Sequence, residues 1–463
     1  MLFSSNTFLF FFLPITVLTY YLCPRRWRNA QLLLASLVFY GWGEPRFLPL
    51  MLIVILLNYF CGIAAAARIE KGMRSGPILW LDIVLNLGIL CFFKYGRFFF
   101  GDRFPEVALP LGISFYIFQA MGYTIDVVRK EVPAQRNLLI FGTYVTLFPQ
   151  LVAGPIVRYR DVAEQLKSRR ENTEQFAYGL QRFVLGLSKK VLLANTFGGA
   201  WNALRDGAGF ISGWLGLMCY TLQIYFDFSG YSDMAIGLGS LFGFSFLENF
   251  QYPYSSQSVT EFWRRWHISL SSWFKEYVYI PLGGNRRGKA RQILNILIVW
   301  LLTGLWHGAS WNFVLWGLIF FVLLTLEKNV YGKFLERTHL LKHAYIIFII
   351  PLTWMVFAIP DMHQLGTYFT RLFPFLPSDE VQSNTRDAVQ AFHNYWKILV
   401  PCVLFSTPLP LMYYKKFRKS GFCLLLLLIL FVLSIRAMMT QTNNPFLYFQ
   451  FCQALFFLQI PFF

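Results

Sequence analysis

Two short segments of the chain each surround a histidine with aromatic residues. His267 lies in the run 261–275, EFWRRWHISLSSWFK, and His307 lies in the run 303–312, TGLWHGASWN. A hydroxyl is a poor nucleophile at neutral pH, and a histidine, with an ordinary pKa of about 6.5, can remove its proton while it attacks a thioester carbonyl. The two segments therefore suit acyl transfer from a thioester to a hydroxyl.

His307 is predicted to lie at membrane depth. An apolar run begins near Arg291 and leads to this histidine, and a second apolar run follows it. At about 1.5 Å per helical residue, this length places the imidazole well inside the membrane or near its far side, where an ionisable group is by default a functional hypothesis. Gly304 and Gly308 allow close approach of backbone or ligand. A histidine satisfied by a neighbouring carbonyl is the alternative that stays open.

The segment around His267 allows two interpretations. On one continuous helix, with Thr260 as its cap, the aromatic residues and the basic residues lie on opposite sides. Such a helix is typical of the membrane interface, where tryptophans lie at headgroup level. The basic side, together with Arg286–Arg291, also suits a phosphorylated donor, because guanidinium groups match phosphate geometry.

Other polar residues offer less chemistry. The cluster 225–233, YFDFSGYSD, either lines an aqueous cavity or forms a helix boundary with Ser and Asp caps. The chain has no Walker A loop, no GxSxG and no HExxH, and no ligand spacing predicts a metal site. Four further histidines are expected in solvated loops: His339, His343, His363 and His393.

Composition indicates the solvent in which these segments must be positioned. Of 463 residues, 56% are hydrophobic and only 14% are charged, against about a quarter in soluble domains. Much of the chain must therefore face lipid. The net charge of +18 comes from short basic clusters between apolar runs, which is typical of cytoplasmic loops facing anionic headgroups rather than of nucleic-acid binding. Seven scattered cysteines are expected to be buried packing residues.

The apolar runs predict an all-α polytopic membrane protein. They lie at 7–22, 30–43, 47–67, 77–93, 107–128, 137–153, 211–226, 292–306, 311–326, 344–360, 397–414 and 421–439. Several are shorter than the roughly 20 residues of a perpendicular span, so we expect tilted or re-entrant pieces, most clearly at Leu109–Ser114. The charged stretch 159–190 is expected to lie on the cytoplasmic surface, and one membrane domain is expected to span residues 1–463.

Loop charge predicts the orientation of the spans. The basic clusters fall on one side if the helices alternate, so that side is the cytoplasm and the N-terminus lies outside as a retained first helix. The stretch Asp361–Lys397 then faces outward, as a docking surface or as a plain connector.

Several segments resemble a known family. They are residues 1–5 (MLFSS), 109–119, 148–156 (FPQLVAGPI), 227–239, 262–284, 306–311 and 446–451 (FLYFQF). Together they resemble the membrane-bound O-acyltransferase family, in the branch of the membrane subunits of alginate and peptidoglycan O-acetylation and, more distantly, of teichoic acid D-alanylation. The order and spacing of the two histidines also resemble that family.

The resemblance implies a helical funnel of about 11 transmembrane helices with re-entrant and interfacial pieces in a bacterial inner membrane. It implies a catalytic His307 and a second important His267. It also implies acetyl-coenzyme A as the donor, with no permanently bound cofactor, and an extracytoplasmic esterase-like (SGNH) partner that completes delivery to a polysaccharide. On this basis the donor-binding residues are expected to be Trp263, Arg264, Arg265, Trp306 and Asn312.

Three alternatives stay open. Transfer of D-alanyl to wall polymers would use the same arrangement. A polysaccharide or lipid transporter would also have broken helices and buried polar residues, although the chain shows no repeat between its halves. An inactive scaffold would recruit a secreted partner. The identity of the acceptor and the choice between direct transfer and transfer through a partner serine do not follow from the sequence.

Overall fold

The computed structural model describes residues 1–151, 154–207, 209–338, 340–373, 375, 385–440 and 446–447. Within these ranges the chain forms helices and turns, with no strand, which confirms the all-α fold class. Five helical stretches are long and apolar enough to cross a membrane, namely Pro45–Glu70, Gly76–Arg103, Trp311–Glu336, Leu341–Ala358 and Gly421–Thr440. Phe8–Leu22 and Ile113–Val128 are shorter apolar helices. The number of about 11 spans stays a prediction.

The chain divides into two compact units. The first contains residues 1–187, 231–248 and 448–463, and the second contains 188–230 and 249–447. Most helices of the first unit are α1 (Leu13–Leu22), α2 (Arg28–Gly43), α3 (Leu48–Glu70), α4 (Gly76–Leu90), α5 (Gly96–Phe100), α6 (Ile113–Val128), α7 (Leu138–Thr146), α8 (Phe148–Leu151), α9 (Tyr159–Lys167) and α10 (Thr173–Ser188). The long helix α12 (Phe210–Leu241) contributes residues to both units.

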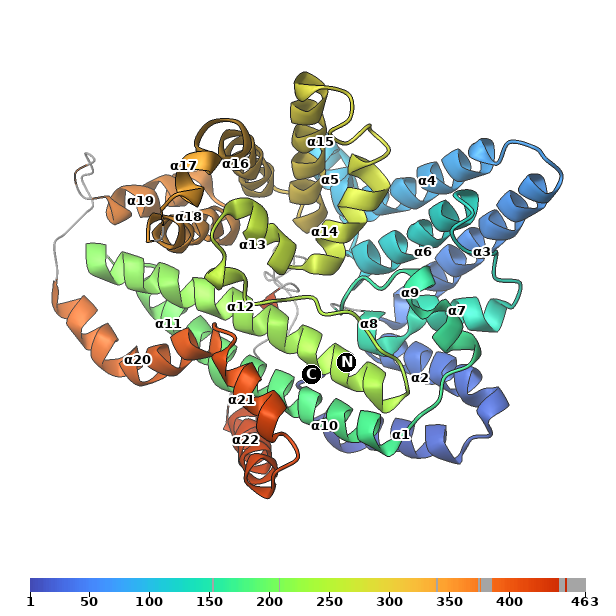
Figure 1. The fold of residues 1–463 in the computed structure, drawn as a ribbon, viewed down its shortest axis with the longest axis horizontal. Helices are drawn as coiled ribbons and strands as arrows, with labels where there is room; N and C mark the ends of the chain where they lie inside the picture. The colour runs from blue at the N-terminus through green and yellow to red at the C-terminus, as the bar shows by residue number, and fades with distance from the viewer. Residues whose placement is uncertain are drawn as a thin grey trace. The chain divides into compact units, whose positions relative to one another are not determined.

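In the first unit, α3, α4 and α6 lie side by side (Figure 1). Asn58 of α3 and Asn86 of α4 exchange two buried hydrogen bonds of 3.0 and 3.2 Å. Amide pairs of this kind hold helices together where lipid provides no hydrophobic driving force. Gly62 of α3 provides the room for Tyr123 of α6, because a Cβ at this position would lie 2.6 Å from the tyrosine ring.

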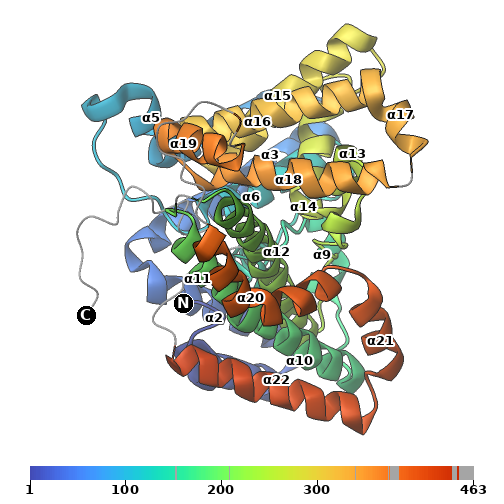
Figure 2. The same ribbon diagram turned by 90° about the vertical axis from the view of Figure 1, so that its left-hand side faces the viewer.

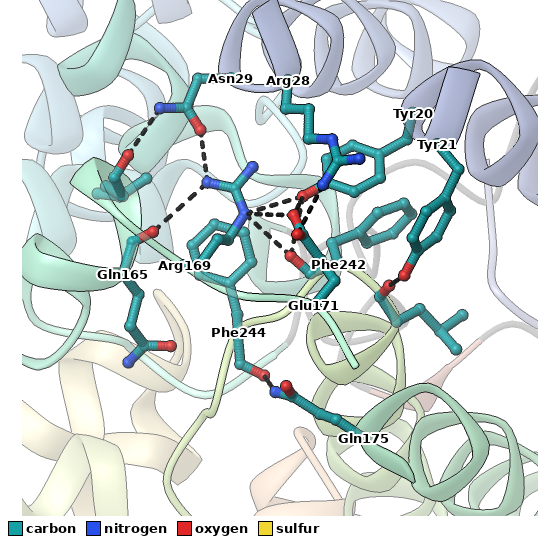
Figure 3. A network of polar contacts seen from close by, with 12 residues as sticks. Tyr20, Tyr21, Arg28, Asn29, Gln165, Arg169, Glu171, Gln175, Phe242 and Phe244 are labelled. Carbon is teal, nitrogen blue, oxygen red and sulfur yellow. Dashed lines mark hydrogen bonds and ion pairs between the residues drawn. The ribbon is translucent and has the colours of Figure 1, made fainter. Parts of the chain in front are cut away.

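A polar network connects the turn between α1 and α2 to the loop between α9 and α10 (Figure 3). The Glu171 carboxylate lies 2.6 Å from the Arg28 guanidinium and accepts a 2.5 Å hydrogen bond from the Tyr20 hydroxyl. Arg169 donates to the Phe242 carbonyl at 2.9 Å and to the Asn29 side chain at 2.6 Å. Because these residues are far apart in sequence, the network fixes loop geometry that local propensity leaves open.

A buried ion pair positions the last turns of α12 in the first unit. Arg182 of α10 contacts Asp233 at 2.6 Å. Near this pair the helices touch backbone to backbone, since a Cβ at Gly237 would lie 2.6 Å from the Gly179 carbonyl oxygen. The cluster 225–233 therefore lies in the middle of α12, and its interpretation as a helix boundary with caps is wrong.

The second unit contains the remaining helices. They are α11 (Asn195–Leu204), the first part of α12, α13 (Val259–Arg265), α14 (Ile268–Phe274), α15 (Lys289–His307), α16 (Trp311–Leu326), α17 (Gly332–Glu336), α18 (Leu341–Ala358), α19 (Met362–Leu372), α20 (Thr385–Phe405), α21 (Leu409–Phe417) and α22 (Gly421–Thr440). α15 and α16 form a helical hairpin, and α18 packs on α16 (Figure 2).

Several local predictions need correction. His343, His363 and His393 lie in α18, α19 and α20 rather than in loops, while His339 lies outside the described residues. The stretch 361–397 contains α19 and the first part of α20, and its role as a docking surface or a connector stays open. Of the six cysteines that the structure describes, Cys61, Cys219 and Cys402 are buried, but Cys91 is exposed. The chain is non-helical from Phe104 until Gly112, whose φ of 73° precedes α6.

Candidate active site

His307 is the last residue of α15, and aromatic side chains surround its imidazole. Three rings meet it edge-on: Trp306 at 5.0 Å, Trp316 at 5.2 Å and Phe357 at 5.1 Å between centroids. The side chain is 8% exposed. A buried imidazole among aromatic walls is shielded from water, so a proton that it takes from a substrate is not lost to solvent.

Two glycines fix the position of His307. A Cβ at Gly304 would lie 2.3 Å from the Phe313 carbonyl oxygen, and a Cβ at Gly317 would lie 2.4 Å from the Trp300 carbonyl oxygen. α15 and α16 therefore cross with their backbones in contact, less than one helical turn before His307. Glycine is required here for close approach, as the sequence suggested.

The helix around His267 is broken, contrary to the prediction of one continuous helix. α13 ends at Arg265 and α14 begins at Ile268, and His267 itself has φ 44° and ψ 54°. This left-handed conformation is uncommon for residues other than glycine, and strain of this kind often accompanies functional sites. The expected cap is also different, since Ser258 caps α13, and Thr260 instead contacts the Glu327 carboxylate.

His267 is held in one tautomer. Its Nδ1 lies 3.2 Å from the Asn249 side-chain oxygen, which accepts a hydrogen bond, so we assign the proton to Nδ1. Nε2 is then the acceptor nitrogen, and it has no hydrogen-bond partner among the described residues. The side chain is 1% exposed, and burial lowers the pKa of His267 to about 3. The imidazole is therefore neutral at physiological pH and suits orienting a polar group better than removing a proton.

Trp306 connects the two histidines. Its ring lies 5.0 Å from the His307 ring and 5.9 Å from the His267 ring between centroids. The structure therefore brings together the two histidines and the tryptophan that sequence reasoning selected from separate segments.

A cavity of about 300 Å³ opens between α13, α14, α15 and α16. Its lining, which we call the basic cavity, includes Trp263, Arg264, Lys275, Trp300, Thr303 and Lys328. Thr303 lies one helical turn before His307. Trp263 packs against Trp316 at 5.6 Å, and Trp316 in turn contacts the His307 ring. The basic cavity therefore ends one aromatic layer away from the imidazole.

The expected donor-binding residues have different environments. Trp263 and Arg264 line the basic cavity, whereas Arg265 contacts Glu261 at 2.5 Å and Ser255 at 3.1 Å. Asn312 is fully buried and donates to the carbonyls of Val356 and Phe357, both at 3.2 Å. Arg265 and Asn312 thus stabilise the walls, and they do not line the basic cavity.

Sequence reasoning missed three residues of this site, because Lys328, Trp316 and Phe357 come from distant segments. Lys275 belongs to the basic side of the His267 segment that was proposed for the donor. Lys328 and Lys275 belong to the basic clusters that flank the spans, so charge clustering was the available signal. Nothing in the sequence pattern indicated the two aromatic rings, because every apolar run of this chain is rich in them.

A second cavity of about 470 Å³ is lined by residues at the end of α11, at the turn that follows α18 and on α19. We call it the polar cavity, and its lining includes Arg205, Asp206, His363, Gln364, Thr367 and Arg371. Ala358 and Ile359 also line it, and they directly follow Phe357, whose ring contacts His307. His307 thus contacts Phe357, which directly precedes two residues of the polar cavity.

The second unit also contains a buried ion pair. Lys190, in a π-helical turn that follows α10, contacts the Asp227 carboxylate, and both side chains are almost fully buried. Asp227 also accepts a 2.7 Å hydrogen bond from the Leu447 amide. The neighbouring Phe228 ring lies 4.6 Å from the His267 ring, so this pair belongs to the surroundings of the site. The described residues contain no cluster of three or more metal-binding side chains.

Comparisons with known proteins show the family of the chain. The family model of the membrane-bound O-acyltransferases matches residues 73–360. The chain is 39% identical to a probable alginate O-acetylase of Pseudomonas putida, over 97% of this chain and 100% of that protein. It is 33% identical to a peptidoglycan O-acetyltransferase of Helicobacter pylori, over 77% of each chain. A teichoic acid D-alanyltransferase of Streptococcus thermophilus is 31% identical, over 45% of this chain and 54% of that protein.

Proposed function

The chain belongs to the membrane-bound O-acyltransferase family, and from this premise we propose that it transfers an acetyl group from cytosolic acetyl-coenzyme A to an extracytoplasmic polysaccharide. It is an O-acyltransferase and a multi-pass protein of a bacterial inner membrane. The alginate O-acetylase of P. putida matches 97% of the chain, so alginate or a similar exopolysaccharide is the acceptor that we favour.

One observation supports this function above the others. Two cavities of different character approach His307: Trp316 contacts both His307 and Trp263 of the basic cavity, and Phe357 contacts His307 and directly precedes Ala358 of the polar cavity. A transferase that uses reactants from two compartments requires this arrangement, because donor and acceptor must reach one base without sharing a solvent. A transporter needs a continuous path instead, whereas the rings of Trp306, Trp316 and Phe357 close around His307.

The reaction follows from general chemistry. His307 removes the proton of the acceptor hydroxyl while the hydroxyl oxygen attacks the thioester carbonyl. The resulting tetrahedral intermediate collapses, the carbon–sulfur bond breaks, and the thiolate takes the proton from the His307 imidazolium. The acetyl ester forms on one side of the base and the free thiol forms on the other. His267, held neutral by burial, acts as a positioning residue near the reacting groups.

The basic cavity suits a phosphorylated thioester. Arg264, Lys275 and Lys328 provide three positive charges, which attract phosphate groups. The wall formed by Trp263 and Trp300 is apolar and suits a flexible uncharged arm that carries the thioester. We assign the basic cavity to the donor and its lysine- and arginine-rich end to the cytoplasm, in accordance with the positive-inside rule. The N-terminus is then outside.

The acyl group and the delivery route complete the proposal. The chain spans about half of the D-alanyltransferase relative, against all of the P. putida O-acetylase, so acetyl is favoured over D-alanyl. A separate extracytoplasmic partner of the esterase-like (SGNH) class, anchored on the outward stretch that contains α19, would complete transfer to the polymer.

The donor assignment is tested with two thioesters. Arg264→Gln, Lys275→Gln and Lys328→Gln are each compared with Arg265→Gln, which changes an arginine outside the basic cavity. We expect the three cavity variants to raise KM for acetyl-coenzyme A severalfold and to leave KM for S-acetyl-N-acetylcysteamine, which lacks phosphate, unchanged. Equal effects on both thioesters, or equal effects of Arg265→Gln, would refute the assignment.

A further inference from the structure

A buried carboxylate joins two helices at the edge of the basic cavity. Glu327 begins the π-helical turn Glu327–Tyr331 that follows α16, and its side chain is buried. Its oxygens accept hydrogen bonds from the amides of Val259 and Thr260, at 2.6 and 3.0 Å, and from the Thr260 hydroxyl. Val259 and Thr260 are the first two residues of α13. Glu327 therefore attaches the start of α13 to the end of α16.

α13 has two caps of different kinds. The first amides of a helix have no partner inside that helix. Glu327 accepts from two of them, and the Ser258 side chain accepts from the Glu261 amide at 3.0 Å. Ser258 directly precedes α13 and acts on this helix alone, whereas Glu327 belongs to another helix. A buried carboxylate is costly unless it is fully hydrogen-bonded, so the contact between Glu327 and α13 is firmly held.

α13 is attached to α16 at two points. Residues at four-residue intervals share one side of a helix, and along α16 and the turn after it they include Trp316, Phe320, Leu324 and Lys328. The Trp263 ring of α13 contacts the first two rings at 5.6 and 5.0 Å. Glu327 holds the other end of α13, next to Lys328. The second attachment therefore sets where α13 places Arg264 in the lining of the basic cavity.

Both lysines of the basic cavity lie in π-helical turns. Lys275 begins the turn Lys275–Tyr279 after α14, and Lys328 is the second residue of the turn Glu327–Tyr331. Turns of this kind are rare and frequently accompany functional sites. Because Glu327 and Lys328 are neighbours in one turn, the residue that holds α13 and a residue that offers a charge to the cavity are fixed together.

We propose that Glu327 is a positioning residue of the donor site. Its carboxylate holds the first turn of α13 on α16 and thereby keeps Arg264, one turn further along α13, in the lining of the basic cavity together with Lys328. Arg264 and Lys328 then act as a pair on the phosphate groups of the donor, while Glu327 itself does not line the cavity. This inference rests on the proposed function, which assigns the basic cavity to the donor.

The test measures binding of coenzyme A, and of pantetheine, which lacks phosphate, to the full-length protein in nanodiscs of zwitterionic lipid, by calorimetry. Glu327→Gln keeps the size of the side chain, but its NH2 group cannot accept a hydrogen bond, so one backbone amide of α13 loses its partner. Ser258→Ala is the matched control, because it removes the other cap of α13 and keeps the attachment through Glu327.

We expect Glu327→Gln to weaken binding of coenzyme A about fivefold, and no more than Arg264→Gln does, with pantetheine binding unchanged. Ser258→Ala should leave both affinities close to wild type. Glu327→Asp keeps the charge on a shorter side chain and should lie between wild type and Glu327→Gln. Because Glu327 acts through Arg264, the double variant Glu327→Gln/Arg264→Gln should bind coenzyme A as Arg264→Gln does alone.

Four results would overturn the inference: no change in Glu327→Gln, an equal loss for pantetheine, an equal loss in Ser258→Ala, or additive losses in the double variant. Each would make Glu327 a structural cap only, while tight binding of coenzyme A by the wild type would still support the donor site. If Glu327→Gln does not fold, Glu327→Asp takes its place in the same cycle. A wild type that binds coenzyme A no more tightly than pantetheine would contradict the assignment of the basic cavity, and the inference with it.

Discussion

Gly304 and Gly317 lie against each other where α15 crosses α16, and each leaves room for a backbone carbonyl of the opposite helix. The distances of 2.3 and 2.4 Å that a Cβ would have to these oxygens leave no space for a methyl group. His307 follows Gly304 by three residues on the same helix. The crossing therefore sets the depth and direction of the imidazole.

Gly304→Ala should displace His307. Overpacking costs about 1–3 kcal/mol, and a displacement of about 1 Å at a catalytic group lowers the rate roughly a hundredfold. We expect a fall in kcat of at least tenfold at nearly unchanged KM for the donor. The control is Gly199→Ala in α11, where a Cβ meets nothing within 4 Å and activity should be kept. Equal activity of the two variants would contradict the positioning role of the crossing.

His267 should make the stability of the protein depend on pH. Burial lowers its pKa from 6.5 to about 3, so between these values the unfolded chain binds a proton that the folded chain does not. The free energy of unfolding therefore rises with pH in this window. The contribution of His267 to it disappears as the pH falls from 6.5 toward 3. We expect the melting temperature to fall from pH 6.5 to pH 4.5, and the fall to be smaller in His267→Gln. His363→Gln, which changes an exposed histidine, should leave the fall unchanged.

The effect of Lys190 on the stability of the protein should depend on the presence of Asp227, and the reverse. Removing one partner of a buried pair costs about 3–5 kcal/mol, while replacing both by apolar residues costs far less. We expect Asp227→Asn and Lys190→Met to unfold earlier in a detergent titration, and the double variant Lys190→Met/Asp227→Leu to be more stable than either. An exposed pair, Arg97 and Asp102 at 3.2 Å, provides the control. Additive losses in the double variant would show that the two charges do not compensate each other.

Glu171 should stabilise the network of Figure 3. Glu171→Gln keeps the shape of the side chain but leaves the Arg28 charge without its partner. Because Arg28 is 14% exposed and Glu171 is 7% exposed, we expect the free energy of unfolding to fall by about 3 kcal/mol. Tyr20→Phe removes only a hydrogen bond to Glu171 and should cost about 1 kcal/mol. Thermal unfolding measures both. A loss in Tyr20→Phe as large as that in Glu171→Gln would argue against the ion pair as the main contribution.

The sequence predicts most of the helical architecture, because apolar runs indicate membrane helices. It also indicates His267 and His307 as candidate site residues, because each lies in a short local run of aromatic residues. The long apolar run before His307 predicts an imidazole at membrane depth, and the structure buries this side chain at the end of α15. The crossing of Gly304 with Gly317 did not follow from the sequence. The resemblance to a family added the pairing of His307 with His267, which spacing alone did not provide.

The break at His267 could not be predicted in the same way. No glycine or proline marks it, and the residues that contact the His267 side chain, Asn249 and Trp306, come from other segments. Asp227 likewise looked like a cap because its partners, Lys190 and the Leu447 amide, are far away in sequence. Tertiary contacts override local pattern at both positions.

The central claim is that His307 is the base for acyl transfer. The direct measurement is the acyl content of the surface polysaccharides of cells that express wild type or His307→Ala at matched membrane abundance and melting temperature. We expect acylation to disappear in His307→Ala. Persistent acylation in a stable, equally abundant His307→Ala protein would contradict the account and make His307 a structural residue.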